Sequence, residues 1–126
     1  MRTYIDSNII IWHLRGEKKA HDLLKKLTSE GSELWMGAIQ RMEVVFFMKD
    51  TEANEIKELL SHFRTQAVTQ EIVDKGGEIY KKWNPSHGVD INDALLAASV
   101  DLHGGRIYTL NIKHFPMPHL AVIKGW

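Results

Sequence analysis

Short β-favouring segments alternate with helical segments along almost the whole chain, and this alternation limits the possible folds more than any other feature. Strands are predicted at residues 2–6, 33–39, 66–70, 106–111 and 120–126. Helices are predicted between them, at residues 9–14, 18–31, 51–64, 71–83 and 89–99. Because this alternation builds strand–helix–strand units, the sequence predicts an α/β sandwich with a central, mainly parallel sheet flanked by helices.

One segment and two helix ends need separate treatment. Residues 40–49 fit a strand or a helix, and their Val and Phe content favours a strand. Thr51 and Asn54 are candidate caps of the helix at 51–64. Asn84 and Pro85 should end the helix at 71–83, because a residue before proline avoids the helical conformation.

The length, cysteine content and charge of the chain limit the kinds of protein that it could be. The 126 residues suffice for one core, so we expect a single domain over residues 1–126. The absence of cysteine excludes disulfides and thiolate metal sites, and suits a reducing cytoplasm. No signal peptide and no apolar run long enough to span a membrane is visible. Sixteen basic and sixteen acidic residues argue against coating nucleic acid by bulk attraction, but allow an acidic pocket with a basic rim.

Two acids stand where they need an explanation. Asp6 ends the first predicted strand, and ligands of open parallel sheets bind beyond the carboxyl ends of the strands. A cap or turn role explains a lone Asp there equally well. Glu43 lies among Met, Val and Phe side chains. Because an unpaired buried carboxylate is costly, Glu43 should lie at a surface edge or be held by a cation.

The stretch "VDINDALLAAS" carries two more acids. Asp90 precedes the apolar run and occupies the natural cap position. Asp93 projects toward the apolar side of the predicted helix, and the second position of a capping box prefers Glu or Gln. We therefore expect Asp93 to be a metal ligand and Asp90 to be a cap with a secondary electrostatic role.

Carboxylates that converge in a cleft raise one another's pKa, and a divalent cation removes this conflict. The set Asp6, Glu43 and Asp93 contains only oxygen ligands, which points to Mg²⁺ or Mn²⁺. Such a site suits phosphodiester hydrolysis, in which the cation activates water and neutralises charge on the phosphate.

The ordered motifs "YIDSN", "DALLAAS" and "TLNIKHF" resemble those of the PIN-domain nucleases, in particular the VapC-type toxin ribonucleases of type II toxin–antitoxin systems. The resemblance extends over essentially the whole chain. It implies a PIN-like three-layer sandwich and Mg²⁺- or Mn²⁺-dependent cleavage of single-stranded RNA. It also implies a homodimer and a cognate antitoxin of VapB type.

Carried over by position, the resemblance makes Asp6, Glu43 and Asp93 the metal-binding acids and Ser7 a supporting hydroxyl. Asn111 stands where many members of the family place a fourth catalytic acid. It offers an oxygen but no charge, so the number of metal ions, one or two, stays open. Asp90 could partly compensate for the lost charge.

Two binding surfaces are expected from side-chain type. Arg106 or Lys113 should contact RNA phosphates near the cleft, together with paired lysines elsewhere in the chain. An apolar groove for an antitoxin segment is expected near the N-terminal helices, although core packing or a dimer interface would explain the same side chains equally well. The large apolar residues concerned are Trp12, Trp35, Phe46, Phe47 and Met48.

Other functions fit the motifs less well. A phospho-aspartate phosphatase of the haloacid-dehalogenase type needs a second Asp two residues after Asp6, where Asn8 stands. A receiver domain needs an acidic pair near its start, and "YIDSN" has one acid. An RNA-processing PIN nuclease without a toxin role, and a non-catalytic PIN-like module that binds RNA or protein, remain as alternatives.

Overall fold

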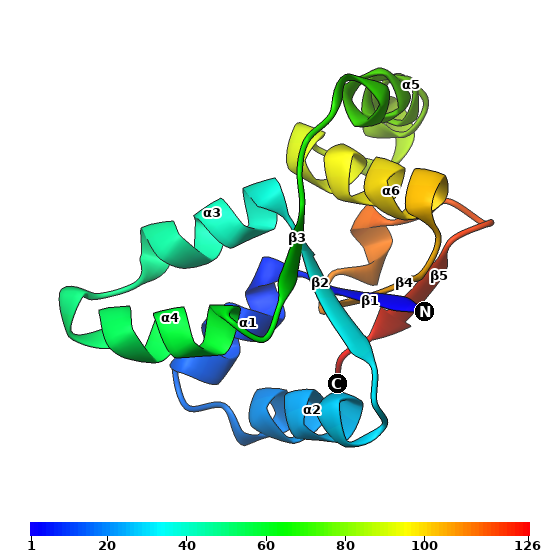
Figure 1. The fold of residues 1–126 in the computed structure, drawn as a ribbon. Coiled ribbons are helices and arrows are strands. Elements are labelled where there is room, and N and C mark those ends of the chain that lie inside the picture. The colour runs from blue at the N-terminus through cyan, green and yellow to red at the C-terminus, as the bar shows by residue number, and fades with distance from the viewer.

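A computed structural model describes residues 1–126 and confirms the α/β fold (Figure 1). The strands are β1 (Arg2–Ile5), β2 (Glu33–Gly37), β3 (Arg64–Gln66), β4 (Arg106–Thr109) and β5 (Ala121–Lys124). The helices are α1 (Ser7–Leu14), α2 (Lys18–Ser29), α3 (Ala38–Phe47), α4 (Ala53–Leu60), α5 (Gln70–His87) and α6 (Ile91–His103). Two short 3₁₀ turns, η1 (Asp50–Glu52) and η2 (Ile112–His114), complete the chain.

The five strands form one parallel sheet in the order β3-β2-β1-β4-β5. The chain moves from β1 to β2 and β3 on one side, and then crosses to β4 and β5 on the other. The order therefore reverses between β1 and β4, and the loops that follow these two strands diverge there. Such a switch point is where open α/β sheets bind ligands.

Two apolar clusters enclose the sheet and make the fold a three-layer sandwich. One cluster joins α1, α2, α3 and α4 to one face of the sheet, and the other joins α5 and α6 to the opposite face. Figure 1 shows α5 and α6 above the sheet and α2 below it. No helix is long and apolar enough to cross a membrane.

The ambiguous segment is helical, so the strand that propensity favoured at residues 40–49 is wrong. Gln40 and Val44, one turn apart, are buried, whereas Met42 and Phe46 are exposed. Burial at a spacing of four fits a helix that packs along one face, and a strand would bury every second residue. The β2 strand accordingly ends at Gly37, two residues earlier than predicted.

The α5 helix continues through Pro85 to His87, so the predicted stop at Asn84 and Pro85 is also wrong. Pro85 lies in the last turn, where a missing N–H removes a single helix hydrogen bond. The helix ends instead at Gly88, which adopts a left-handed conformation with φ 65°. Asn84 secures this end by donating from its side chain to the Val89 carbonyl.

Two further boundaries differ from the sequence-based expectation. The third strand is residues 64–66 and not 66–70, because Thr69 accepts a hydrogen bond from the Ile72 N–H and caps α5. Neither Thr51 nor Asn54 caps a helix. The η1 turn stands in front of α4, and its Glu52 carboxylate accepts the Lys49 N–H at 2.7 Å.

Candidate active site

Four of the predicted site residues, Asp6, Glu43, Asp93 and Asn111, come from segments at the carboxyl edge of the sheet. Asp6 directly follows β1, and Asn111 follows β4 by two residues. Glu43 lies in α3, which begins where β2 ends, and Asp93 lies in the first turn of α6. Four different segments therefore deliver these side chains to the switch point of the fold.

Asp6 is the most firmly held of the acids. Its side chain caps α1 by accepting the Ser7 N–H at 2.8 Å, and its other oxygen accepts the Thr109 hydroxyl at 2.8 Å. The residue is only 7% exposed. Burial raises the pKa of Asp6, the bonds from Thr109 and Ser7 oppose this, and nearby Asp90 raises it further.

Thr109 and Asn8 are the site residues that sequence reasoning missed. Thr109 is fully buried, donates to Asp6, and accepts the Asn111 N–H at 3.1 Å. The Asn8 side chain accepts the Leu110 N–H at 3.4 Å. These bonds tie the loop after β4 to the start of α1. The signal in the sequence was a hydroxyl residue at the end of a buried strand.

Asp90 is the cap of α6, as predicted. It has extended backbone geometry, and its side chain accepts the Asp93 N–H at 2.7 Å. The two acids differ as expected, because no backbone N–H donates a hydrogen bond to the Asp93 side chain to complete a capping box. Asp90 therefore has a structural role that needs no ligand.

Asp93 carries a buried carboxylate oxygen without a hydrogen bond. Its side chain is 15% exposed, and its Oδ2 atom has no hydrogen-bonding partner. The His114 Nδ1 atom lies 3.3 Å away, within ion-pair distance but outside hydrogen-bond geometry. Burial, followed by repulsion from Asp90 and Asp6, raises the pKa of Asp93 to about 8. Such a carboxylate favours a proton or a cation.

Glu43 belongs to the same electrostatic group. Burial raises its pKa first, repulsion from Asp6 and Asp90 raises it further, and a bond from the Ser7 hydroxyl opposes the change. Since Glu43 and Asp93 both respond to Asp6 and Asp90, the acids lie close enough to repel one another across the carboxyl edge. Ser7 is thus placed between two of the predicted ligands.

The acids suit a cation in charge and ligand type, although they do not form a closed cage. No group of three His, Asp or Glu side chains lies close enough together to hold a metal ion. The buried, unbonded oxygen of Asp93 and the mutual repulsion of the acids are both relieved by a divalent cation. Joint coordination would require the carboxylates to lie closer together than they do in this structure.

Arg106 does not lie near the cleft, so that expectation is wrong. It begins β4, at the amino edge of the sheet, where its guanidinium donates to the hydroxyls of Thr3 and Ser32. The strand places Arg106 and Asn111 at opposite edges of the sheet. A basic residue at the first position of this strand cannot reach the acids at its end.

Lys113 lies at the carboxyl edge, as predicted, and has a basic neighbour that the sequence did not reveal. A hollow of about 260 Å³ is lined by Asn111, Lys113, His114 and Lys124, among others. Lys124 comes from the end of β5, the strand beside β4. The fold therefore brings two lysines and an imidazole to one side of the acids.

A buried amide joins α3 to α6 beneath the site. Gln40 is nearly fully buried, and its side chain donates to the Asn92 carbonyl at 3.4 Å. A Cβ atom at Gly37 would overlap the Gln40 side-chain oxygen, so a larger residue there would require the Gln40 side chain to shift. The bond connects the two helices that carry Glu43 and Asp93.

The apolar residues of the predicted antitoxin groove do not all lie together. Trp35 packs against Tyr4 on β1 and lies beneath the Arg2 guanidinium, so it is a packing residue of the sheet. Met48 packs against the core. Trp12, Phe46 and Phe47 are exposed, and Phe46 is 77% exposed. We name the large exposed apolar residues of α1 and α3, Trp12, Met42, Val45, Phe46 and Phe47, the α1–α3 patch.

The chain matches the family model described as "PIN domain" over residues 3–115. It is 33% identical to ribonuclease VapC10 of Mycobacterium tuberculosis over 114 residues, which cover 90% of this chain and 85% of that protein. It is 32% identical to ribonuclease VapC19 of the same organism, over 90% of this chain and 91% of that protein.

Solved structures share the fold at lower identity. A toxin–antitoxin complex from Klebsiella pneumoniae superposes with a TM-score of 0.79 at 23% identity, over 98% of both chains. The DNA-bound VapBC of Salmonella typhimurium gives a TM-score of 0.80 at 15% identity, over 100% of this chain and 99% of that one. At these identities the structures support the fold alone.

Proposed function

The chain belongs to the PIN-domain family and is a VapC-type member of it, and we propose that it is a metal-dependent endoribonuclease that cleaves single-stranded RNA. We further propose that it acts as the toxin of a type II toxin–antitoxin pair, with residues 1–126 as one nuclease domain. The observation that carries the proposal is the buried, unbonded oxygen of Asp93 beside other acids at the carboxyl edge of the sheet.

Asp6, Glu43 and Asp93 are the proposed ligands of Mg²⁺ or Mn²⁺. When bound, such a cation makes a coordinated water more acidic and neutralises charge on the phosphate. Thr109 holds Asp6 in one orientation through its hydroxyl, and the Ser7 N–H holds the other Asp6 oxygen. The Ser7 hydroxyl lowers the pKa of Asp6 and Glu43 and is the proposed supporting hydroxyl of the site. Asn111 supplies a neutral oxygen at the same edge, which favours one strongly held cation over two.

Lys113 and Lys124 are the proposed phosphate contacts. They line one hollow with His114, whose ring lies beside Asp93, so RNA held there has its backbone next to the acids. The chain carries no net charge, and local lysines must therefore supply the attraction. The RNA affinity of the inactive Asp6→Asn variant should fall as salt rises. In the Lys113→Ala variant the affinity should depend less steeply on salt, because one phosphate contact is lost. An affinity independent of salt would contradict this assignment.

Cleavage and its metal requirement can be tested with purified protein. Single-stranded RNA should be cut, EDTA should stop the reaction, and added Mn²⁺ should restore it. Asp6→Asn and Asp93→Asn should lose orders of magnitude in rate, whereas Asp90→Asn should keep most of it because asparagine also caps helices. Full activity in excess EDTA would exclude the metal mechanism, and equal loss in the two α6 variants would make Asp90 a ligand as well.

The α1–α3 patch is the proposed docking surface for an antitoxin of VapB type. A hollow of about 360 Å³ is lined by three apolar and three charged residues, Ile11, Leu14, Phe47, Arg15, Lys49 and Glu52, and exposed aromatic side chains lie on α1 and α3 beside it. Structural neighbours of the chain are toxins in complex with their antitoxins. Co-expression with a small adjacent gene should give a co-purifying complex, and Phe46→Asp should disrupt it. Growth unaffected by expression of the chain alone would argue for an RNA-processing nuclease without a toxin role.

A further inference from the structure

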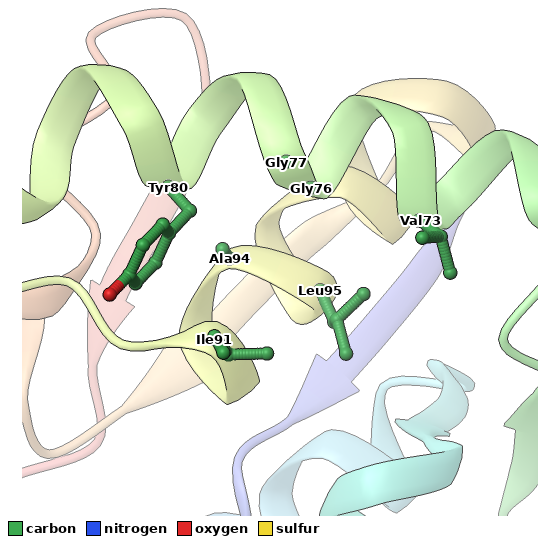
Figure 2. Close-up of a pocket in the computed structure, with 7 residues that line it drawn as sticks. All are labelled: Val73, Gly76, Gly77, Tyr80, Ile91, Ala94 and Leu95. Atoms are coloured by element: carbon green, nitrogen blue, oxygen red, sulfur yellow. The ribbon is translucent and has the colours of Figure 1, made fainter.

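Two adjoining hollows lie between α5 and α6 and form one groove, which we name the α5–α6 groove. The first hollow encloses about 310 Å³ and is apolar, with walls that include Val73, Gly77, Tyr80, Ile91 and Leu95 (Figure 2). The second encloses about 420 Å³, shares Tyr80 and Ile91 with the first, and adds the polar side chains of Asn84, Asp90 and Asn92. The groove is therefore apolar at one end and polar at the other.

The polar end of the groove adjoins the proposed metal-binding acids. Asn92 directly precedes Asp93 in the first turn of α6, and Asp90 accepts the Asp93 N–H at 2.7 Å. The Asn92 carbonyl also accepts the Gln40 side chain of α3, the helix that carries Glu43, at 3.4 Å. An RNA strand with one phosphate at these acids would therefore place a neighbouring nucleotide at the mouth of the groove.

The groove suits a nucleobase and its ribose better than a phosphate. No lysine or arginine lines either hollow, so the groove offers no positive charge to a phosphate. Tyr80 is half-buried, and Figure 2 shows its ring extending from α5 toward the start of α6, beside Ile91. Proteins bind the unpaired bases of single-stranded RNA by stacking them on such rings. At the polar end, the Asn84 and Asn92 amides offer donors and acceptors to ribose hydroxyls.

Two adjacent glycines line the apolar end, and packing within the chain explains only one of them. A Cβ at Gly76 would lie 3.2 Å from the Leu95 side chain, so glycine lets α5 approach α6 closely. A Cβ at Gly77 would meet nothing within 4 Å. Glycine destabilises a helix interior relative to alanine, so Gly77 has a cost without a benefit inside the chain. Glycine is expected where a ligand approaches the backbone closely, and at this position it keeps the groove open.

We propose that the α5–α6 groove holds one unpaired base of the RNA substrate, from a nucleotide beside the cleaved bond. The base stacks on Tyr80 and lies over Gly77, and Asn84 and Asn92 contact its ribose. Because the Tyr80 hydroxyl is the only polar side-chain group at the apolar end, the groove selects for stacking area, and purines bind better than pyrimidines. This inference rests on the proposed ribonuclease function and adds a base preference at one position of the substrate.

RNA binding by the inactive Asp6→Asn protein tests the stacking contact without cleavage, and fluorescence anisotropy is the measurement. The probes are two labelled oligouridylates, identical except that one carries a single central adenosine. The adenosine should raise the affinity about 3–10-fold, because the strand can shift until the purine lies in the groove. Tyr80→Leu, which keeps an apolar side chain, should abolish this preference, and Tyr80→Phe, which keeps the ring, should retain it. A preference that survives Tyr80→Leu, or no preference in the protein with Tyr80, would overturn the proposal.

Gly77→Leu tests the apolar end and keeps the test independent of folding. Because position 77 is open within the chain, this variant should fold and should melt about 2–5 °C higher than the parent protein. It should nevertheless bind the adenosine probe no better than the all-uridine probe. Gln70→Leu is the matched control, since Gln70 is a neutral, exposed residue of the same helix outside both hollows.

The outcomes separate this inference from the nuclease proposal. A Gly77→Leu variant that changes the sedimentation of the chain but keeps the purine preference would assign the groove to another protein chain and overturn the base site. A purine preference that depends on Tyr80, in a chain whose wild type cuts no RNA, would refute the nuclease and support the base site. Absence of any RNA binding would refute both.

Discussion

Replacing Asp93 by asparagine should stabilise the metal-free protein at neutral pH while it abolishes cleavage. The Asp93 pKa is raised to about 8 by burial and by repulsion from Asp90 and Asp6. An unfolded aspartate has a pKa of about 4. Between these two values the folded state holds a proton that the unfolded state releases, so the free energy of unfolding falls as pH rises. Asparagine removes this dependence and keeps the shape of the side chain.

The expected gain follows from the same quantities. Each tenfold difference in acidity between the folded and unfolded states corresponds to ~1.4 kcal/mol. Water and salt screen the repulsion from exposed Asp90, and His114 lies 3.3 Å from the Asp93 carboxylate, so only part of the difference should appear. We expect Asp93→Asn to raise the free energy of unfolding by about 1–3 kcal/mol at pH 7.

Urea denaturation in EDTA at pH 7 and again near pH 4 measures this gain. The advantage of Asp93→Asn should be present at pH 7 and should be mostly lost near pH 4, where the folded residue carries the proton and the unfolded residue is about half protonated. Saturating Mn²⁺ should reverse the order, because a ligand that binds only the folded state stabilises it and the variant binds it weakly. A variant that is no more stable than the wild type at pH 7, or a gain independent of pH, would refute the reasoning.

Variants at three other positions test the supporting contacts. Asp90→Asn should not lower stability in chemical denaturation, because asparagine also caps helices and the repulsion from Asp90 is removed, whereas Asp90→Ala should lose about 0.5–2 kcal/mol with the cap; equal stability of the two variants would show that the cap contributes little. Thr109→Val should slow cleavage by about 10–100-fold and move the acidic limb of the pH–rate profile upward, because Asp6 loses a bond that lowers its pKa. An unshifted profile would remove Thr109 from the site. Gly37→Ala should cost about 1–3 kcal/mol by displacing Gln40, and a neutral result in the same denaturation assay would mean that the amide has room to move.

The sequence predicted the fold class because its alternating segments leave few architectures open. The sequence-based prediction of secondary structure was wrong where local preference and tertiary packing disagreed. Propensity made residues 40–49 a strand, but burial of Gln40 and Val44 on a single face makes them a helix. Pro85 looked like a stop, but a proline in the last turn of α5 disturbs little. Both errors came from local preferences that tertiary packing overrides.

The residues of the candidate site were likewise predictable only in part. Acids at strand ends and helix starts can be located in a sequence, because those positions are marked by the surrounding pattern. The partners that orient them cannot, because Thr109 reaches Asp6 across 103 positions of the chain. The misplaced Arg106 is instructive, since its strand was predicted correctly. A strand has two ends, and being in the right strand places a residue at the cleft only if it stands at the carboxyl end.

The four acids differ in how well hydrogen bonds stabilise them, and this difference is the physical argument for function in this chain. Asp6 has a donor for each oxygen, and Asp90 stabilises a helix end. Glu43 and Asp93 have no comparable structural contacts to offset the repulsion from the other acids. Asp93 also has a buried carboxylate oxygen without a hydrogen bond. Selection for stability alone would replace both by neutral residues. Asp6 and Asp90 therefore stabilise the structure around the site. A bound divalent cation would relieve the most repulsion at Glu43 and Asp93.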